Sequence, residues 1–225
     1  MISASVSNLA LYEMWAKDEA LDLKWILDKL SSRETTPAMA AGSAFHSAME
    51  TIEEGKEYGV LTANGYRFNM LCDVDIPLPK IQEVSIQKQY GDLLVRGRVD
   101  AWSLGTISDY KTTEQFDPDR FLDRITWRLY LDMTGVSRFI WHIFQVKESG
   151  EKEYDVYNYH SMTQYRYVGM HEDCERVAAE YCRFAGEYLV KTGTEDAGVV
   201  PSEKARGAVP YIQAEPGESL FGEEA

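Results

Sequence analysis

The chain has 225 residues, a length that suits one compact domain with a tail. Hydrophobic residues make up 44% of it and aromatic residues 12%, so it has enough apolar surface for a core and is not expected to be wholly disordered. The formal net charge of −14 opposes long-range attraction of nucleic acid, unless basic residues cluster at a groove or divalent metal ions carry the phosphate contact.

The N-terminal part of the chain predicts two helices. Residues 7–30 mix apolar and charged side chains in the manner of a helix. Thr36 and Pro37 then supply an N-cap and a first-turn proline, and the helical pattern continues until Gly55. The face that this second helix is expected to bury consists of Phe45, Ala48, Met49 and Ile52.

From about residue 82 the apolar residues recur at every second position, which indicates strands. The alternation continues on both sides of residues 91–92, so the segment up to residue 101 is predicted to be a hairpin. A further strand is expected at residues 106–112, after a turn at residues 104–105.

Residues 117–135 predict a third helix, which begins at Asp117-Pro118 and closes at Gly135. Two more strands are expected at about residues 137–147 and 152–160, and a long helix then reaches Tyr188. The predicted order is ααβββαββα. This order indicates an α/β domain of residues 1–191, in which helices flank a central mixed sheet.

Residues 192–225 are rich in Gly, Pro and Glu with little periodicity, and predict an irregular acidic tail. No run in the chain approaches the roughly 20 apolar residues of a membrane-spanning helix, and the N-terminus does not look like an export signal. The three cysteines are Cys72, Cys174 and Cys182, an odd number without CxxC spacing, so neither a disulfide framework nor a zinc site is predicted. We therefore expect a soluble protein of the reducing cytoplasm with no membrane partner.

Two acidic residues are predicted to face each other across the turn at residues 104–105. A two-residue turn there sets Asp100 opposite Asp109, and Lys111 shares the face of Asp109. Opposed side chains have Cβ atoms about 4.5 to 5.5 Å apart, at which like charges repel, so the pair favours a cation between its carboxylates. Mg²⁺ and Mn²⁺ suit such oxygen ligands, and Lys111 would position an attacking water or stabilise charge on a phosphate.

The simpler alternative is that Asp109 and Lys111 form an ion pair on a solvated strand, as an isolated DxK pattern often does. Ile107 and Tyr110 disfavour it, because they indicate that both faces of this strand are covered. His46, at the edge of the buried face of its helix, is either a residue that reaches the sheet or a hydrogen-bonded core histidine.

Three segments resemble the PD-(D/E)XK nucleases, in their RecB-like exonuclease branch. GRVD at residues 97–100 and SDYKTT at residues 108–113 resemble motifs II and III, and GSAFHSAME at residues 42–50 resembles the helical GxxxHxxxE motif. The resemblance implies a restriction-endonuclease-like core and a metal-dependent DNA exonuclease of recombination, repair or replication. The alternative is a catalytically silent relative of the nuclease fold that binds nucleic acid or protein, such as a recombination or replication protein, and has a regulatory role.

Carried over residue by residue, the resemblance makes Asp100, Asp109 and Lys111 catalytic. It assigns Mg²⁺ or Mn²⁺ to His46, Asp100, Asp109 and the backbone carbonyl of Tyr110, with Glu50 as a further candidate ligand or a helix-surface charge. Some members of the branch hold an iron–sulfur cluster on one cysteine before the His motif and three late cysteines. No cysteine precedes His46 here, so no cluster is expected.

The branch usually carries a QxxxY motif on the next helix, where this chain has Thr126 in place of Gln. Arg120, Arg124 and Arg128 recur at intervals of four there and predict a basic stripe for DNA phosphates, and Tyr130 is a candidate for stacking on a base. The alternatives are a stripe paired with nearby aspartates and an aromatic ring packed in the core.

Overall fold

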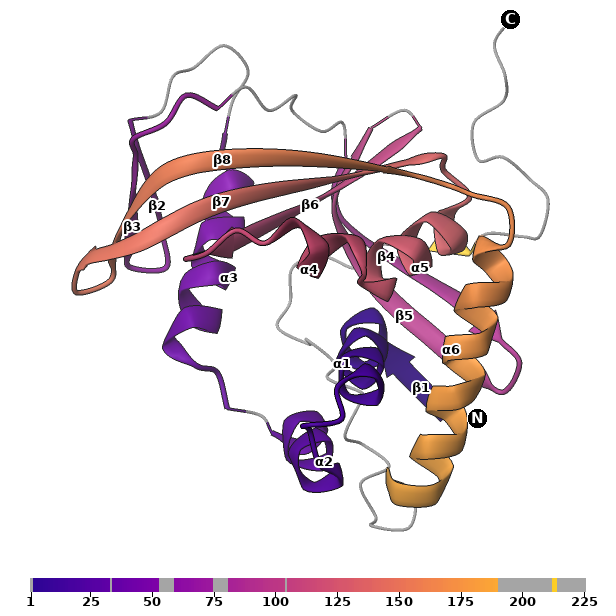
Figure 1. Ribbon diagram of the computed structural model, residues 1–225. Coiled ribbons are helices and arrows are strands. Elements are labelled where there is room, and N and C mark those ends of the chain that lie inside the picture. The colour runs from indigo at the N-terminus through magenta and orange to yellow at the C-terminus, as the bar shows by residue number, and fades with distance from the viewer. Residues whose placement is uncertain are drawn as a thin grey trace, which may run out of the picture.

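The computed structural model describes residues 2–32, 34–52, 59–74, 81–103, 105–189 and 212–213. It has an α/β fold with one mixed nine-stranded sheet flanked by helices, as the sequence predicted (Figure 1). Its strands are β1 (Ile2–Ser5), β2 (Val60–Ala63), β3 (Tyr66–Met70), β4 (Ile81–Tyr90), β5 (Leu93–Ser103), β6 (Thr106–Thr113), β7 (Arg138–Gly150), β8 (Glu153–Tyr165) and β9 (Ile212–Gln213).

The strand order is β2-β3-β8-β7-β6-β5-β4-β9, with β1 paired to β5 outside this path. The β4–β5 and β5–β6 pairs are antiparallel hairpins, as predicted, whereas β6 and β7 are parallel because helices connect them. Four strands were not predicted, namely β1, β2, β3 and β9. Each is five residues or shorter, too short for a clear alternation. β9 falls in the predicted irregular tail, whose other residues lie outside the described ones.

The predicted helix at residues 7–30 is instead two helices, α1 (Val6–Lys17) and α2 (Leu23–Ser31). Asp22 causes the break, because its carboxylate accepts a 2.7 Å hydrogen bond from the Trp25 amide and starts a new helix. Helix α3 (Pro37–Met49) begins at the predicted Thr36 cap and ends before Gly55, which lies outside the described residues.

The predicted helix at residues 117–135 also divides, into α4 (Pro118–Leu122) and α5 (Ile125–Thr134). A buried carboxylate from α1 stabilises the second start: Glu13 Oε2 accepts a 2.8 Å hydrogen bond from the Ile125 amide. The residue before it, Arg124, is extended. The final helix is α6 (Met170–Phe184), followed by a π-helical turn at Ala185–Leu189.

Apolar residues form two clusters on opposite faces of the sheet. Helices α1, α2, α5 and α6 contribute to the larger cluster, and α3 packs into the smaller one together with residues from β2, β3 and β8. In Figure 1, α3 lies well apart from α6. In the described part of the chain, no helix is long and apolar enough to cross a membrane.

Gly97 lets α5 approach β5 closely. A Cβ atom at this position would lie 2.7 Å from Cε1 of Tyr130, closer than real contacts allow. The hydroxyl of Tyr130 donates a 2.8 Å hydrogen bond to the Arg98 carbonyl, which fixes the helix on the strand. The glycine of the GRVD segment therefore has a packing role that brings α5 to the strand of Asp100.

Candidate functional site

The strands β5 and β6 separate at the acidic pair. Their ladder contains three residue pairs and ends where Ala101 faces Ser108, so Asp100 and Asp109 come directly after it. The register agrees with the predicted opposition of the two aspartates, although Leu104 of the turn lies outside the described residues. Beyond the ladder, the Tyr110 amide donates a 2.9 Å hydrogen bond to Asp100 Oδ2. The side chain of Asp100 thus bridges the point at which the strands diverge.

Lys111 binds both oxygens of Asp109. Its Nζ atom lies 2.7 Å from Oδ1 and 2.6 Å from Oδ2, and 3.3 Å from the backbone carbonyl oxygen of Tyr110. Burial would lower the pKa of Lys111, but the charges of Asp109 and Asp100 outweigh burial and raise it. Lys111 is therefore an ammonium ion held beside the acidic pair.

The two carboxylates have pKa values shifted in opposite directions. Burial, with the charge of Asp100, raises the pKa of Asp109 to about 7, and Asp109 is only 5% exposed. Burial also acts to raise the pKa of Asp100, but the hydrogen bond from His46 and the charge of Lys111 hold it below its usual range. The raised pKa of Asp109 shows that the carboxylate pair is short of positive charge, which a divalent cation between the carboxylates would supply.

His46 reaches this pair from α3, on the other side of the fork. Its Nδ1 atom lies 3.3 Å from Asp100 Oδ2. Burial would lower the pKa of His46, but the hydrogen bond to Asp100 and the charge of that residue outweigh it and raise the pKa. The structure therefore brings His46 to Asp100, whereas sequence reasoning left open a core histidine.

Glu83 on β4 joins the site and was not anticipated. The β4–β5 register sets it across from Asp100, and its φ of 57° breaks the regular ladder there. Burial raises its pKa, and the charges of Asp100 and Glu50 raise it further. The candidate Glu50, at the C-cap of α3, therefore lies near enough to act on Glu83. The predicted turn at residues 91–92 would have identified Glu83, because a two-residue hairpin turn pairs it with Asp100.

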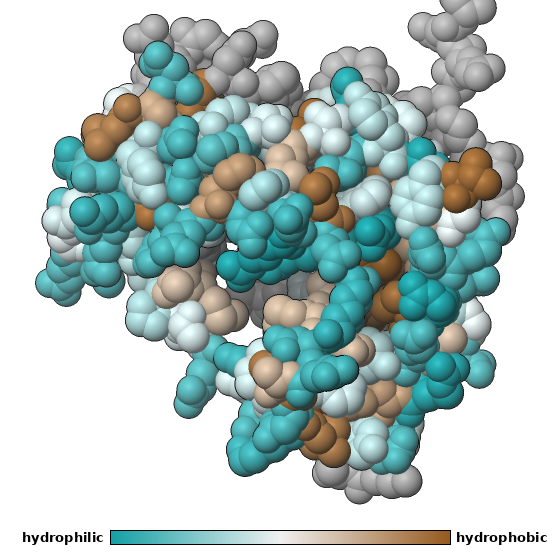
Figure 2. All heavy atoms as spheres, viewed as in Figure 1, coloured by the Kyte–Doolittle hydropathy of each residue, from teal (hydrophilic) through white to brown (hydrophobic). Residues whose placement is uncertain are grey.

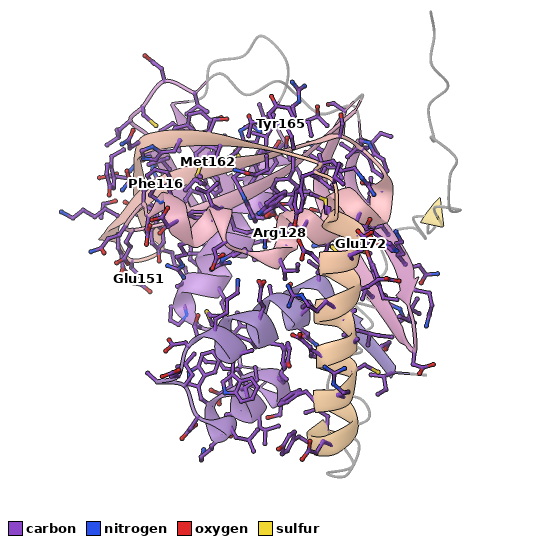
Figure 3. All side chains as sticks on the ribbon, turned by 45° about the vertical axis from the view of Figure 1, so that its right-hand side comes forward. Phe116, Arg128, Glu151, Met162, Tyr165 and Glu172 are labelled. Carbon is purple, nitrogen blue, oxygen red and sulfur yellow. The ribbon has the colours of Figure 1, made fainter. Side chains whose placement is uncertain are left out.

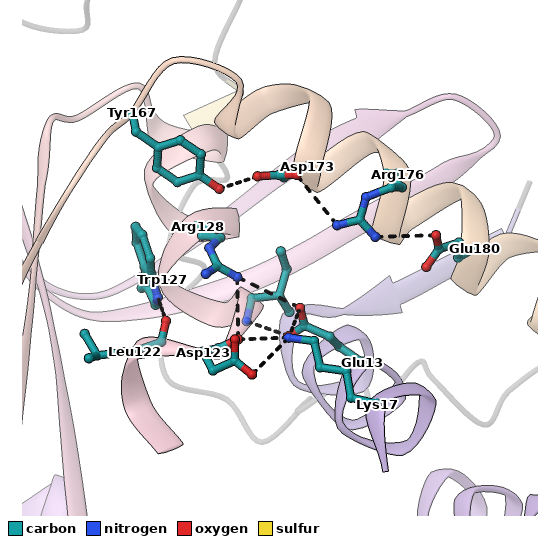
Figure 4. A network of polar contacts seen from close by, with 11 residues as sticks. Glu13, Lys17, Leu122, Asp123, Trp127, Arg128, Tyr167, Asp173, Arg176 and Glu180 are labelled. Atoms are coloured by element: carbon teal, nitrogen blue, oxygen red, sulfur yellow. Dashed lines mark hydrogen bonds and ion pairs between the residues drawn. The ribbon is translucent and has the colours of Figure 1, made fainter. Parts of the chain in front are cut away.

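The three arginines of the predicted stripe do not share one helix, because the chain breaks at Arg124. Arg124 lies near the acidic pair: burial and the charge of Arg120 lower its pKa, and Asp109 raises it. Arg128 instead points into a polar network between α1, α5 and α6, where it lies 4.0 Å from Glu13 and stacks on Trp127 (Figure 4). Arg124 thus lies close to Asp109, with Arg120 near it, and Arg128 turns away.

Arg128 also lines a cavity of about 420 Å³ that is separate from the acidic pair and lies between α1, α5 and α6. Figure 3 shows the side chain of Arg128 beside the first half of α6. The cations around this cavity are each paired, Lys17 with Glu13 at 3.1 Å and Arg176 with Glu180 at 3.4 Å.

The position of Tyr130 differs from its predicted role in stacking on a base. Tyr130 is 8% exposed and packs against Gly97, and its ring lies parallel to that of Phe139 at 6.2 Å. A ring enclosed in this way is a core residue and is not available to stack on a base.

The donors at the fork suit a hard divalent cation, because they are carboxylates and a backbone carbonyl with one imidazole. Within the described residues, however, no three side chains of His, Cys, Asp or Glu are arranged as a metal-binding group. Each donor is held by a protein partner: Asp109 by Lys111, Asp100 by His46 and Glu83 by Arg98. Binding of a metal ion therefore requires these contacts to rearrange.

The surface has a hollow near the helices that surround the sheet. On the face drawn in Figure 2 the surface is hollowed in the region that α1, α3 and α4 frame in Figure 1. Of these helices, α3 carries His46 and α4 carries Arg120.

Comparison with known proteins gives little further information. No protein-family model matches the chain, and no curated protein matches it. Among solved structures, the crystal structure of SSO0001 is similar over 89% of this chain and 89% of its own, with 11% sequence identity and a TM-score of 0.48.

Proposed function

We propose that the protein is a Mg²⁺- or Mn²⁺-dependent nuclease that hydrolyses phosphodiester bonds in DNA, and that it acts as an exonuclease. The observation that carries the proposal is the fork of β5 and β6, where Asp100, Asp109 and Lys111 meet His46 from another element. A largely enclosed carboxylate pair with a lysine and a histidine is not explained by stability, because burying charges is costly. Its chemistry suits metal-assisted hydrolysis.

In this proposal the metal ion is held by Asp100, Asp109 and the carbonyl of Tyr110, with His46 and Glu83 at the edge of the same site. When bound, Mg²⁺ or Mn²⁺ supplies Lewis-acid activation of the phosphodiester. Lys111, which stays protonated, orients the attacking water and offsets the negative charge that develops on the phosphate.

The net charge of −14 opposes the binding of DNA, and Arg120 and Arg124 provide local positive charge that counteracts it. Arg124 is close enough to Asp109 for the two charges to act on each other, so its guanidinium group can bind the phosphate next to the one being cleaved. A local basic group beside the metal outweighs the overall charge at contact distance, where the phosphate is screened from distant carboxylates.

The second candidate is a catalytically silent relative that binds a recombination or replication protein. One observation favours it: each donor of the described fork is engaged by a protein partner, and no three are arranged around a metal. Thr126, in place of the expected Gln, points the same way.

An assay with end-labelled single- and double-stranded DNA in Mg²⁺, Mn²⁺ or EDTA separates the two candidates. We expect nucleotides to be released from the ends of linear DNA only with a divalent metal, and a covalently closed circle to stay intact. Cleavage of the circle would make the enzyme an endonuclease. No cleavage, combined with no Mn²⁺ binding at millimolar concentration, would favour the silent relative.

A further inference from the structure

An ion pair sits at the edge of the candidate metal site. Arg98 on β5 places its Nε atom 2.6 Å from Glu83 Oε2 on β4. The two side chains differ in exposure: that of Arg98 is 63% exposed and that of Glu83 is 22% exposed. The guanidinium group therefore reaches from solvent onto a carboxylate that is only partly exposed.

Glu83 needs this cation in the metal-free protein. Its neighbours include the carboxylates of Asp100 and Glu50, which repel its charge, while Arg98 and His46 attract it. Arg98 is thus the cation in direct contact with an acidic group that lies across from Asp100. A divalent cation in the same acidic site would supply the same compensation at closer range.

We propose that Arg98 is a stand-in for the metal ion at Glu83, and that metal binding releases its guanidinium group to hold a DNA phosphate. This inference rests on the proposed nuclease function. Once Glu83 faces a divalent cation, that cation repels Arg98, and the largely exposed side chain moves without disturbing the core. A freed guanidinium group bonds phosphate with two parallel hydrogen bonds, and Arg98 is two residues from Asp100.

The release couples the two ligands. The metal ion must displace Arg98 before binding, so the arginine weakens the affinity for metal when DNA is absent. With metal present, the same arginine strengthens the affinity for DNA. By linkage, metal and DNA each then increase the affinity for the other, and Arg98 carries part of that coupling.

The first experiment measures Mn²⁺ affinity by calorimetry without DNA, in wild type, Arg98→Ala and Arg98→Gln. We expect both variants to bind Mn²⁺ more tightly, by about threefold, because loss of a partly exposed ion pair leaves Glu83 free for the metal. Arg176→Ala is the matched control, since Arg176 pairs with Asp173 and Glu180 on α6 and should leave the affinity unchanged. An unchanged or weaker Mn²⁺ affinity in the Arg98 variants would overturn the proposal and make Arg98 a support for Glu83.

The second experiment measures binding of a labelled single-stranded oligonucleotide at saturating Mn²⁺, in a Lys111→Ala background in which DNA is not consumed. Adding Arg98→Ala should weaken binding and reduce the salt slope by about one. Arg98→Ala should also reduce the increase in DNA affinity that is observed when Mn²⁺ is added. Equal DNA affinity and an equal slope with and without Arg98 would also overturn the proposal.

Failure of this inference can be told from failure of the proposed function. If the wild-type protein binds Mn²⁺ and cleaves DNA, and the Arg98 variants behave like wild type, only the proposed release of Arg98 is ruled out. If the wild-type protein binds no Mn²⁺ at millimolar concentration, both the release of Arg98 and the proposed nuclease function are ruled out.

Discussion

At the scale of single residues, Asp109 is buried beside the carboxylate of Asp100 and bound to the ammonium group of Lys111. Its pKa is raised from 3.8 to about 7. The folded metal-free protein therefore binds a proton more tightly than the unfolded chain, and the stability due to this proton is lost as the pH rises from about 4 to about 7. A functional carboxylate is here expected to reduce stability at neutral pH.

Asp109→Asn tests whether this carboxylate supports cleavage while it lowers stability, because the substitution removes the charge at nearly constant volume. We expect cleavage to fall to below about 10% of wild type, given the orders of magnitude that a catalytic metal contributes. We also expect the metal-free variant to melt at a higher temperature than wild type above pH 7, and the difference to disappear toward pH 4. Calorimetric melting across this range and a cleavage assay measure both effects, and full activity in the variant would contradict the catalytic assignment.

His46→Ala tests whether His46 is a metal ligand. A histidine must be neutral to bind a metal, and the pKa of His46 is raised above 6.5, so wild-type Mn²⁺ affinity should increase as the pH rises above that value. The variant should bind Mn²⁺ more weakly and with a smaller pH dependence, the remainder coming from Asp109. Calorimetric Mn²⁺ titration across about pH 6 to 8 measures the change. A variant that is destabilised but binds Mn²⁺ like wild type would show a histidine with only a structural role.

At the scale of elements, the break between α4 and α5 changes what the arginines do. A continuous helix would align Arg120, Arg124 and Arg128 on one face. The extended Arg124 turns this residue toward Asp109, while Arg128 follows α5 into the network of α1 and α6.

A matched pair of variants measures this difference. Arg124→Gln should weaken DNA binding and lower the salt slope by about one, the loss of a single phosphate contact. Arg128→Gln should leave the slope unchanged, and should lower the melting temperature because Glu13 loses a cation. Fluorescence titrations of DNA at several salt concentrations provide the measurement. Equal salt slopes for the two variants would indicate that Arg124 and Arg128 both contact DNA phosphates, as a continuous basic stripe predicts.

At the scale of the whole molecule, Asp132 joins elements that are distant in sequence. Its buried carboxylate accepts hydrogen bonds from Lys88 on β4, Tyr90 at the end of that strand, Arg166 after β8 and His171 on α6, all between 2.7 and 2.9 Å. Helix α5 is thereby fixed to both the sheet and α6. Because the carboxylate is fully enclosed, its removal leaves several donors without an acceptor.

Asp132→Ala should therefore be the most destabilising single change among those considered. The cationic partners are partly exposed, so we expect a loss at the lower end of the roughly 3 to 5 kcal/mol found when one side of a buried ion pair is removed. Burial would raise the pKa of Asp132, but the hydrogen bonds from His171, Lys88 and Tyr90 lower it. Its contribution is thus present above pH 3.8 and lost as the pH falls further. Urea unfolding of both proteins at neutral and acid pH checks this, and equal stability would contradict it.

The sequence by itself determined what depends on neighbours along the chain. Alternation and two-residue turns set the β4–β5 and β5–β6 hairpins, so the opposition of Asp100 and Asp109 and the face of Lys111 followed from local spacing. The same spacing also pairs Glu83 with Asp100. These relations are fixed by the covalent chain and the period of a strand.

Only the tertiary structure decided which distant residues meet. Ile125 starts a helix because Glu13, 112 residues earlier, accepts a hydrogen bond from its amide, and nothing near Ile125 in sequence indicates that cap. The approach of His46 to Asp100 and the enclosure of Tyr130 against Gly97 depend in the same way on how helices pack on the sheet. Packing of separate elements is governed by shape and burial over the whole core, which periodicity within one segment does not encode.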